Sequence, residues 1–439
     1  MRLNFSPCNS HGTTPVLEWT SPETLLTAAF VLALVVGLLL KFWLASRQIR
    51  HVSQLRDAVP DNFAHRITLG AHRKAADYTI AKTRFGLVEL AIATGMTLGW
   101  TLLGGLDALN TLLLRLGAPA MAQQLLLIGA FAMIGGLMEL LLNLYQTFGI
   151  EARFGFNTMT PRLWLADLVR SVLLGCVIGL PIAALVLWLM GTAGGLWWLW
   201  AWAAWMVFNL LLLMIYPTYI APLFNKFKPL EDETLKRRVG ALMQRCGYTA
   251  KGLFVMDGSR RSAHANAYFT GIGAAKRVVF YDTLLARLSP EEVDAVLAHE
   301  LGHFKYRHIL KRIAAMFLLS LLGFALLGWL SGQMWFYTGL GVQPHVLAGV
   351  PNDALALLLF MLVAPMFGQF VTPVFAQLSR RHEFEADAYA IAQTSSADLS
   401  AALLKLYQDN ASTLTPDPVY AKFYYSHPPA TERLAKMSS

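Results

Sequence analysis

Long apolar runs constrain this chain more than any other feature of its sequence. Seven stretches are almost wholly apolar over the length that a helix needs to cross a bilayer, about 20 residues. Only 14% of the residues are charged, against about 25% in typical soluble proteins. Buried helices of a soluble core rarely repeat seven times at this length, so the sequence predicts a mainly α-helical membrane protein. The predicted spans are Leu25–Ala45, Phe85–Gly105, Leu125–Leu144, Ser171–Met190, Leu196–Ile215, Ile313–Leu330 and Ala354–Phe375.

Basic residues are distributed unevenly between the loops that join these spans. Nine lie from Lys41, near the end of the first span, to Arg84, just before the second, whereas the tail before the first span holds only Arg2. Because Lys and Arg concentrate on the cytoplasmic side of a membrane, we expect the amino terminus outside and the carboxyl terminus in the cytoplasm. The net charge of +9 then reflects topology and contact with anionic lipid rather than nucleic-acid binding. The nine residues are Lys41, Arg47, Arg50, Arg56, Arg66, Arg73, Lys74, Lys82 and Arg84.

The spans divide the chain into four segments. Residues 1–219 hold the first five spans, and residues 313–376 hold the last two. Residues 220–312, predicted to be cytoplasmic, begin with the polar helical stretch DETLKRRVGALMQRCG. The runs GLFVMDGS, NAYFTG and KRVVFYD then predict a small sheet, because they are β-type and bounded by Gly and Asp. Residues 377–439 form a second cytoplasmic segment.

A helix is predicted between the last β-type run and the sixth span. Ser289 and Glu292 have the S-x-x-E spacing of a capping box, and Pro290 stands in the first turn, where proline is favoured. A helix that begins at about Pro290 carries the sequence AHELGH, residues 298–303, in its interior. Gly302 lies within it, where glycine costs roughly 1 kcal/mol relative to alanine. Close packing against another backbone would explain that glycine.

The AHELGH sequence has the H-E-x-x-H spacing of zinc peptidases. Residues four apart lie on one face of a helix, so His299 and His303 point the same way and can bind one zinc ion per chain. Glu300 lies about 100° round the helix, from where it can reach the attacking water without binding the metal. A chance match in a hydrophobic protein is the alternative.

A catalytic zinc ion requires a third protein ligand and one open position. The best candidate is Glu383 in the sequence SRRHEFEADAYA, where Glu383 and Asp387 are four apart on a predicted helix and Glu385 projects elsewhere. We expect Glu383 to be the third ligand and Asp387 to accept the free ring N–H of a ligand histidine. Two spans separate His303 from Glu383, so the chain returns to the same side of the membrane. A solvated charged helix just past a span is the alternative.

Other polar residues are candidates for contacts with substrate. His427 is held by two prolines before a final short helix, and could donate to the oxyanion of a tetrahedral intermediate. An ordinary surface histidine is the alternative. His264, Asn266 and Ala267 lie in SAHANAYFTG; if NAYFTG is an edge strand, it can pair with an extended peptide substrate. His308 is interpreted as structural.

Two carboxylates interrupt the predicted spans. Glu89 and Glu139 lie inside apolar runs, and ionisable residues in spans usually face a bundle interior or a water-filled cavity. Hydrolysis within a membrane protein requires such a wet chamber. A paired structural carboxylate is the alternative.

The sequences HELGH, SRRHEFEAD, SHPP and SAHANAY together resemble the membrane-integral zinc metallopeptidases of the CAAX prenyl endopeptidase type. Two further stretches are similar to that family specifically. They are IEARFGFNTMTPRLWLADLVR, residues 150–170, and YPTYIAPLFNKFKPL, residues 216–230. The heat-shock-type membrane zinc proteases share the zinc motifs, but should lack FGFN and LFNKFKPL. The resemblance extends over nearly the whole chain.

This resemblance implies a fold and a set of residue roles. The fold is a barrel of seven transmembrane helices that encloses a large aqueous chamber and is capped from the cytoplasm by a zincin-like peptidase domain. The implied zinc ligands are His299, His303 and Glu383, and the implied general base is Glu300. Asp387 would lie next to a zinc ligand, and His427 and Asn266 would contact the substrate or intermediate. We also expect Ala267 and His264 to bind substrate.

We therefore expect an integral-membrane zinc metalloendopeptidase acting on isoprenylated CAAX-type or other membrane-associated peptides. The compact loops, and a terminal LAKMSS without an endoplasmic-reticulum retrieval signal, favour a bacterial inner membrane. One alternative is a zinc protease for general quality control of membrane proteins. The other is a non-catalytic channel or scaffold with structural zinc, against which Glu300 argues, because a structural site needs no base.

Overall fold

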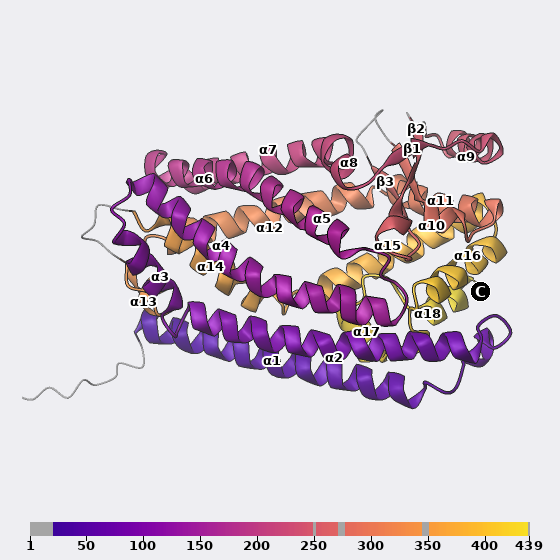
Figure 1. The fold of residues 1–439 in the computed structure, drawn as a ribbon, viewed down its shortest axis with the longest axis horizontal. Coiled ribbons are helices and arrows are strands. Elements are labelled where there is room, and N and C mark those ends of the chain that lie inside the picture. Colours follow the sequence, from indigo (N-terminus) through magenta and orange to yellow (C-terminus); the bar gives the residue numbers. More distant parts are fainter. Residues whose placement is uncertain (1–20, 249–251, 271–276, 345–350, 438–439) are drawn as a thin grey trace, which may run out of the picture.

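Long helices run along an elongated molecule, and a smaller part with mixed secondary structure occupies one end of it (Figure 1). The computed structural model describes residues 21–248, 252–270, 277–344 and 351–437. The apolar helices run along the long axis, and the sheet lies at the other end with the carboxyl terminus.

Five helical segments are long and apolar enough to cross a membrane, and two bent helix pairs raise the number to seven if each pair is one span. These segments contain all seven predicted spans. Short π-helical turns continue α4, join α5 to α6, and follow α7. The helices are α1 (Pro22–Gln54), α2 (Leu69–Trp100), α3 (Gly105–Leu114), α4 (Ala120–Tyr145), α5 (Pro161–Leu174), α6 (Leu180–Thr192), α7 (Trp197–Ile215), α8 (Ala221–Phe224), α12 (His308–Leu330), α13 (Met334–Thr338), α14 (Asp353–Gly368) and α15 (Thr372–Gln393).

Two predicted spans are not continuous helices, contrary to the sequence-based expectation. The chain bends by 52° between α2 and α3 and by 65° between α14 and α15. At the first bend α2 ends at Trp100, and Gly104, with a φ of +75° that glycine adopts freely, directly precedes α3. At the second, Pro365 lacks an N–H for the last turn of α14, and Pro373 stands in the first turn of α15, where proline is favoured at a helix start. The helix therefore restarts in a new direction.

The predicted small sheet is present and has four strands. Strand order is β1-β2-β4-β3, with β2 and β4 parallel and the two outer pairs antiparallel. The three β-type runs form β2, β3 and β4, and β3 is an edge strand. The strands are β1 (Phe227–Pro229), β2 (Gly252–Met256), β3 (Ala267–Thr270) and β4 (Arg277–Tyr281).

Short helices surround the sheet and bury one core with it. Phe280 of β4, Leu242 of α9 and Leu301 of α11 are each 1% exposed and belong to this core. The predicted polar helix is α9, and the final short helix is α18. The helices of this end are α9 (Glu233–Arg245), α10 (Asp282–Leu285), α11 (Pro290–Lys305), α16 (Ser396–Asp409), α17 (Pro418–Tyr424) and α18 (Ala430–Met437).

Helix α11 begins at the predicted capping box. Ser289 Oγ accepts from Glu292 N–H at 3.3 Å, and the Glu292 carboxylate accepts from Ser289 N–H at 2.7 Å. Position 302 requires a glycine, because a Cβ there would lie 2.9 Å from the Ala386 Cα of α15. The close backbone approach expected from the sequence is therefore confirmed.

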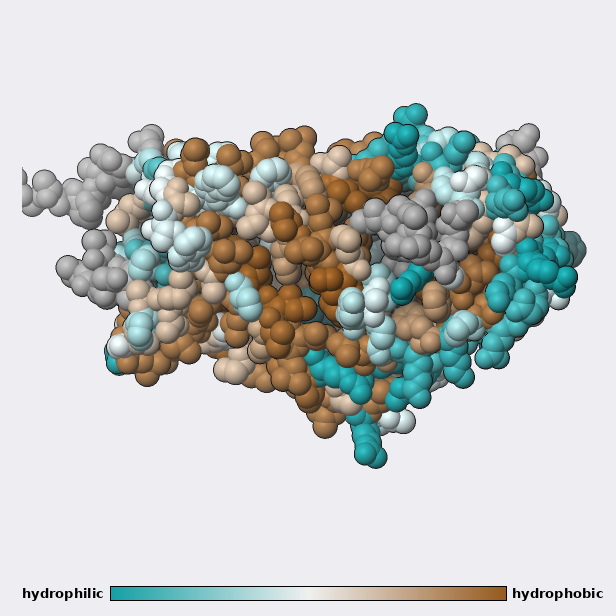
Figure 2. All heavy atoms as spheres, turned by 90° about the horizontal axis from the view of Figure 1, so that it is seen from above, coloured by the Kyte–Doolittle hydropathy of each residue, from teal (hydrophilic) through white to brown (hydrophobic). Residues whose placement is uncertain are grey.

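Apolar and hydrophilic residues occupy different parts of the surface along the long axis. Figure 2 shows apolar residues over the middle of the molecule and hydrophilic residues gathered at the end that holds the sheet. Large apolar side chains stand exposed on the long helices, including Leu32, Leu141 and Val177 at 63%, 62% and 71%. A soluble protein does not expose contiguous apolar surface on this scale.

The Gly302 contact leads to a first prediction. Gly302→Ala should lower the thermal unfolding midpoint, because overpacking against Ala386 costs typically 1–3 kcal/mol and outweighs the helix propensity gained. Gly240→Ala is the control: it lies within α9, where an added Cβ meets nothing within 4 Å, and should raise the midpoint. An equal rise in both variants would show that α11 and α15 do not need this glycine.

Candidate active site

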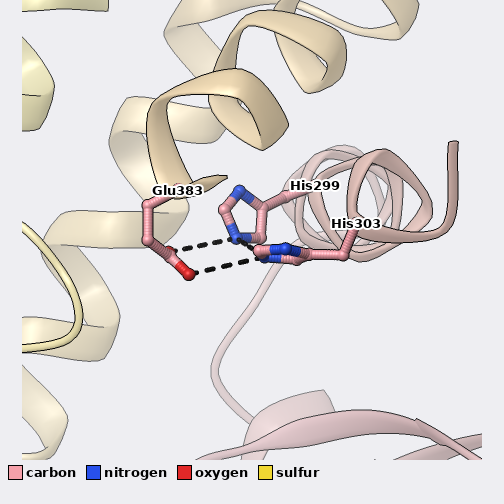
Figure 3. A group of neighbouring side chains, drawn as sticks. All are labelled: His299, His303 and Glu383. Carbon is pink, nitrogen blue, oxygen red and sulfur yellow. Dashed lines mark hydrogen bonds and ion pairs between the residues drawn. The ribbon is translucent and has the colours of Figure 1, made fainter. Parts of the chain in front are cut away.

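Three side chains from two helices converge on one point (Figure 3). His299 and His303 of α11 direct their Nε2 atoms at each other across 3.3 Å. The Glu383 carboxylate of α15 completes the group, with Oε2 at 3.5 Å from His299 Nε2 and Oε1 at 3.4 Å from His303 Nε2. Among the residues that the structure describes, this is the one group of three or more His, Cys, Asp or Glu side chains whose ligand atoms lie this close, within 4.8 Å.

The three side chains fit a metal cation. Glu383 is 4% exposed, and its Oε2 is buried without a hydrogen-bond partner. A buried polar atom in this state is costly unless something satisfies it. Two imidazole nitrogens and a carboxylate oxygen, all facing one point, are the donor set of a zinc site that leaves one position open. The metal implied by the sequence therefore has a suitable set of ligands in the structure.

Asp387 contacts the ring nitrogen of His299 that faces away from His303 and Glu383. Its Oδ1 is 2.9 Å from His299 Nδ1, so it can accept that ring N–H and leave Nε2 free. Arg433 of α18 donates to both oxygens of Asp387 and places Nη1 3.9 Å from Glu383 Oε2. The predicted partner of a ligand histidine is where the sequence analysis placed it, and Arg433 compensates the two buried carboxylates.

The surroundings of the two histidines shift their pKa values in opposite directions. Burial alone would lower the pKa of His299, but hydrogen bonds to Asp387 and Glu383 raise it to about 9. Burial lowers the pKa of His303 to about 4, and the charge on His299 adds to that shift. The second imidazole therefore stays neutral, which is the form that binds a metal.

Glu300 follows His299 on α11 and is half-buried. Burial raises the pKa of its carboxyl above the usual value, and the charge on Glu383 acts in the same direction. A carboxylate whose pKa moves toward neutrality is a better general base.

His427 reaches the same group from the segment before α18. Its Nε2 lies 3.3 Å from Glu383 Oε1, while 64% of its side chain stays exposed. It therefore stands at the open side of the group, where a substrate would arrive. The structure brings together this predicted residue and the three predicted ligands.

The structure places His264 in a different cluster. His264 Nε2 lies 3.5 Å from Glu151 Oε2, Nδ1 lies 3.2 Å from Asn410 Oδ1, and the ring stacks on Phe156 at 4.4 Å. Tyr78 of α2 donates to Glu151 as well, at 2.6 Å. His264 thus ties the segment before β3 to the membrane helices, and its prediction as a substrate contact stays untested.

Asn266 and Ala267 lie at the start of the edge strand. Asn266 is exposed, and its Oδ1 accepts the N–H of Ala267 at 2.8 Å. Tyr281 N–H donates to the Asn266 carbonyl at 3.1 Å. Antiparallel pairs alternate, so the backbone N–H and C=O groups of Ala267 and Phe269 face the free edge of the sheet.

Three residues of the site were missed by the sequence analysis: Arg433, His308 and Glu385. Arg433 stands in TERLAKM, which has no spacing relation to the zinc motifs. His308 was interpreted as structural, yet its Nδ1 lies 3.0 Å from His303 Nδ1. Glu385 does project away from Glu383 as expected, and there it meets His308.

Comparison with known proteins agrees with this geometry. A family model described as "CAAX prenyl protease N-terminal, five membrane helices" matches residues 48–226, and one described as "Peptidase family M48" matches residues 229–439. The chain belongs to peptidase family M48. It is therefore a multi-pass integral-membrane zinc metalloprotease.

Individual relatives share most of the chain. "CAAX prenyl protease 1" of Saccharomyces cerevisiae is 36% identical, with 72% of each chain covered. The homolog of Arabidopsis thaliana is 38% identical over 67% of this chain and 69% of its own. The crystal structure of S. mikatae Ste24p matches with a TM-score of 0.87 and 30% identity, covering 96% of this chain and 100% of that one.

Arg433 provides a second prediction. Arg433→Met should lower the thermal unfolding midpoint strongly, because removing one partner of a buried ion pair costs about 3–5 kcal/mol. Arg287→Met is the control: Arg287 is 63% exposed and lies 3.9 Å from Asp409, and exposed pairs contribute little. Equal midpoints for the two variants would show that Arg433 does not compensate Asp387 and Glu383.

Proposed function

We propose that this protein is a CAAX prenyl protease-like zinc endopeptidase, which cleaves isoprenylated CAAX-type peptides, or other membrane-associated peptides, near their carboxyl termini. One observation carries the proposal: a three-ligand metal group with an adjacent carboxylate stands at the junction of the peptidase part and a set of membrane helices. Relatives at 36% and 38% identity over about seventy per cent of their length carry the name CAAX prenyl protease 1.

Zinc would be held by His299, His303 and Glu383. When bound, the ion supplies Lewis acidity, which lowers the pKa of a water toward about 7 and polarises the scissile carbonyl. Glu300 takes a proton from the attacking water and later passes it to the leaving amine. His427 donates a hydrogen bond to the oxygen that becomes negatively charged. Asp387 holds the His299 ring with Nε2 directed at the metal.

A barrel around an aqueous chamber fits the packing of the spans. In the five single spans, 6–22% of the most apolar window is buried. One core at the end away from the sheet joins several spans and includes Phe30 of α1, Leu187 of α6 and Leu359 of α14. Glu89 is half-buried and Glu139 exposed, although both lie within apolar helices. Spans that converge at one end and stay loosely packed elsewhere, with carboxylates along them, support an internal space filled with water.

The peptidase end would face the cytoplasm. The loop between α1 and α2 lies at that end in Figure 1, and the nine basic residues that precede the second span lie in this loop and in the adjoining parts of the two helices. Lys and Arg favour the cytoplasmic side. The proposed peptidase domain comprises residues 220–312 and 377–439, and the compact loops support a bacterial inner membrane.

A substrate would bind in an extended form along β3. The free edge of this strand presents the backbone groups of Ala267 and Phe269, and the Asn266 side chain lies beside them. An extended peptide can pair with such an edge as an additional strand. His264 supports the segment from behind, through its contacts with Glu151 and Asn410.

A combined measurement of zinc content and cleavage tests the proposal. The substrates are a farnesylated CAAX peptide and its unlipidated twin, given to wild type and Glu300→Gln. We expect about one zinc per chain in both proteins and cleavage of the lipidated peptide by wild type only, because the general base supplies about 10²–10⁴-fold in rate. Glu291→Gln, an exposed change on the same helix, is the control and should retain activity.

The outcomes separate the parts of the proposal. Equal cleavage of both peptides would overturn the preference for isoprenylated substrates and favour general membrane proteolysis. Near-normal cleavage by Glu300→Gln would overturn the role of Glu300. Zinc binding without cleavage by wild type would overturn the CAAX assignment.

The substrate edge gives a further prediction. Phe269→Pro removes an N–H from the free edge but no bond to β4, so we expect KM to rise roughly threefold to tenfold with the fold retained. Tyr268→Pro removes an N–H that faces β4 and should lower the thermal unfolding midpoint instead. An unchanged KM in Phe269→Pro would contradict substrate pairing at this edge.

A further inference from the structure

A second chain of hydrogen bonds leads away from the metal group through α11, α12 and α15. His303 Nδ1 lies 3.0 Å from His308 Nδ1, and His308 Nε2 lies 3.0 Å from Glu385 Oε2. Glu385 also accepts from Arg381 Nε at 3.2 Å. The function derived above uses none of His308, Glu385 or Arg381.

A metal ion bound to His303 Nε2 would determine which ring nitrogen carries the proton in both His303 and His308. Because Nε2 then gives its lone pair to the metal, the ring proton of His303 must lie on Nδ1, which donates to His308 Nδ1. His308 must accept there, so its own proton lies on Nε2. That N–H points to the Glu385 carboxylate, which can only accept. One arrangement of ring protons therefore satisfies metal binding at His303 Nε2, the hydrogen bond from His303 to His308, and the hydrogen bond from His308 to Glu385.

The backbone at the junction of α11 and α12 makes the first link possible. In a continuous helix, a residue five positions along lies about 140° round the axis, so His308 could not reach His303. Arg307 has a φ of 56° and ψ of 33°, a left-handed conformation that is uncommon for residues other than glycine. This single residue ends α11 and turns the chain so that the His308 ring meets His303 Nδ1.

Packing leaves the His308 ring little freedom. His308 is 4% exposed. Its ring stacks on His382 with centroids 3.9 Å apart and planes 12° apart, and on Tyr306 at 5.7 Å and 21°. With its faces packed, the ring makes hydrogen bonds only through its two nitrogens. His308 therefore accepts a hydrogen bond from Nδ1 of His303, as Asp387 does from Nδ1 of His299. In this arrangement His308 accepts as an imidazole, and it donates in turn to the Glu385 carboxylate.

We propose that His308 is a positioning residue that holds His303 with Nε2 directed at the metal, and that Glu385 orients His308. The proposal rests on the proposed binding of zinc by His303. Outer hydrogen-bond partners of metal ligands typically contribute 10–100-fold in metal affinity. The same range is expected for His308, with a smaller effect for Glu385, which acts one link further away.

The test measures zinc affinity by competition with a chelator, and the visible absorption of the Co²⁺-substituted protein, in detergent. His308→Leu should bind zinc 10–100-fold more weakly than wild type and shift the Co²⁺ bands, because His303 loses its acceptor. His308→Asn should restore most of the affinity, since an amide oxygen can accept from His303 Nδ1. Glu385→Gln should stay near wild type and Glu385→Leu should fall, because only the amide keeps an acceptor for His308.

The backbone offers an independent pair of variants. Arg307→Gly should keep wild-type affinity, because glycine adopts a positive φ freely. Arg307→Val should weaken zinc binding, because a β-branched residue is strained in that conformation and displaces His308. Thermal unfolding midpoints are measured alongside.

Failure of this inference can be told from failure of the proposed function. Wild type without stoichiometric zinc would overturn the metal site itself. Stoichiometric zinc in wild type, together with an unchanged zinc affinity in His308→Leu, would overturn the positioning role only. So would a loss of affinity in His308→Asn as large as that in His308→Leu, because a purely structural histidine would give no rescue by an acceptor.

Discussion

The contact between the backbones of α11 and α15 is the constraint on which the site depends. Two ligands come from α11 and one from α15, so the distance between these helices determines whether three side chains can reach one ion. Gly302 permits that distance, because any Cβ there would meet the Ala386 Cα. The glycine that separates Leu301 from His303 is therefore a packing residue inside a catalytic motif. It allows the short side chain of Glu383 to close the ligand set.

The close contact between α11 and α15 also creates a need for charge compensation. Bringing α15 close buries Glu383 and Asp387 together, and two buried carboxylates require cations. Arg433 supplies one positive charge to this pair, and a metal ion at the group would supply the others. The carboxylates also hold the histidines, with Asp387 at His299 Nδ1. Binding a metal, positioning its ligands and stabilising the packing of three helices thus depend on one set of contacts.

Local patterns in the sequence predicted the parts of the site that lie within single helices. The capping box at Ser289 gave the start of α11, and the four-residue spacing gave the shared face of Glu383 and Asp387. Arg433 could not be predicted, since its contact with Asp387 depends on how α18 packs against α15. His308 was missed for a related reason: the periodicity of a continuous helix directs it away from His303, and the left-handed Arg307 is not visible in the pattern.

The positions of the membrane helices were predictable from the sequence, but their shapes were not. Apolar runs located the segments that form long helices, and the predicted span Ala354–Phe375 runs uninterrupted across the bend between α14 and α15. The two prolines on either side of that bend were the available signal. Charge distribution gave the grouping of basic residues at one end. The proposed barrel and chamber would depend on the packing between spans, which the composition of single helices does not encode.

The bend between α14 and α15 connects the membrane helices to the chemistry. Glu383 lies eleven residues into α15, about 16 Å along a helix that restarts directly after α14. The helix that carries the other two ligands, α11, is followed closely by the membrane helix α12, which begins at His308, five residues after His303. Each ligand helix thus leads into an apolar helix without an intervening linker, so the metal group is fixed relative to the membrane. A peptide tethered to the bilayer by a lipid would meet its scissile bond at a constant height, which a peptidase domain on a flexible linker could not provide.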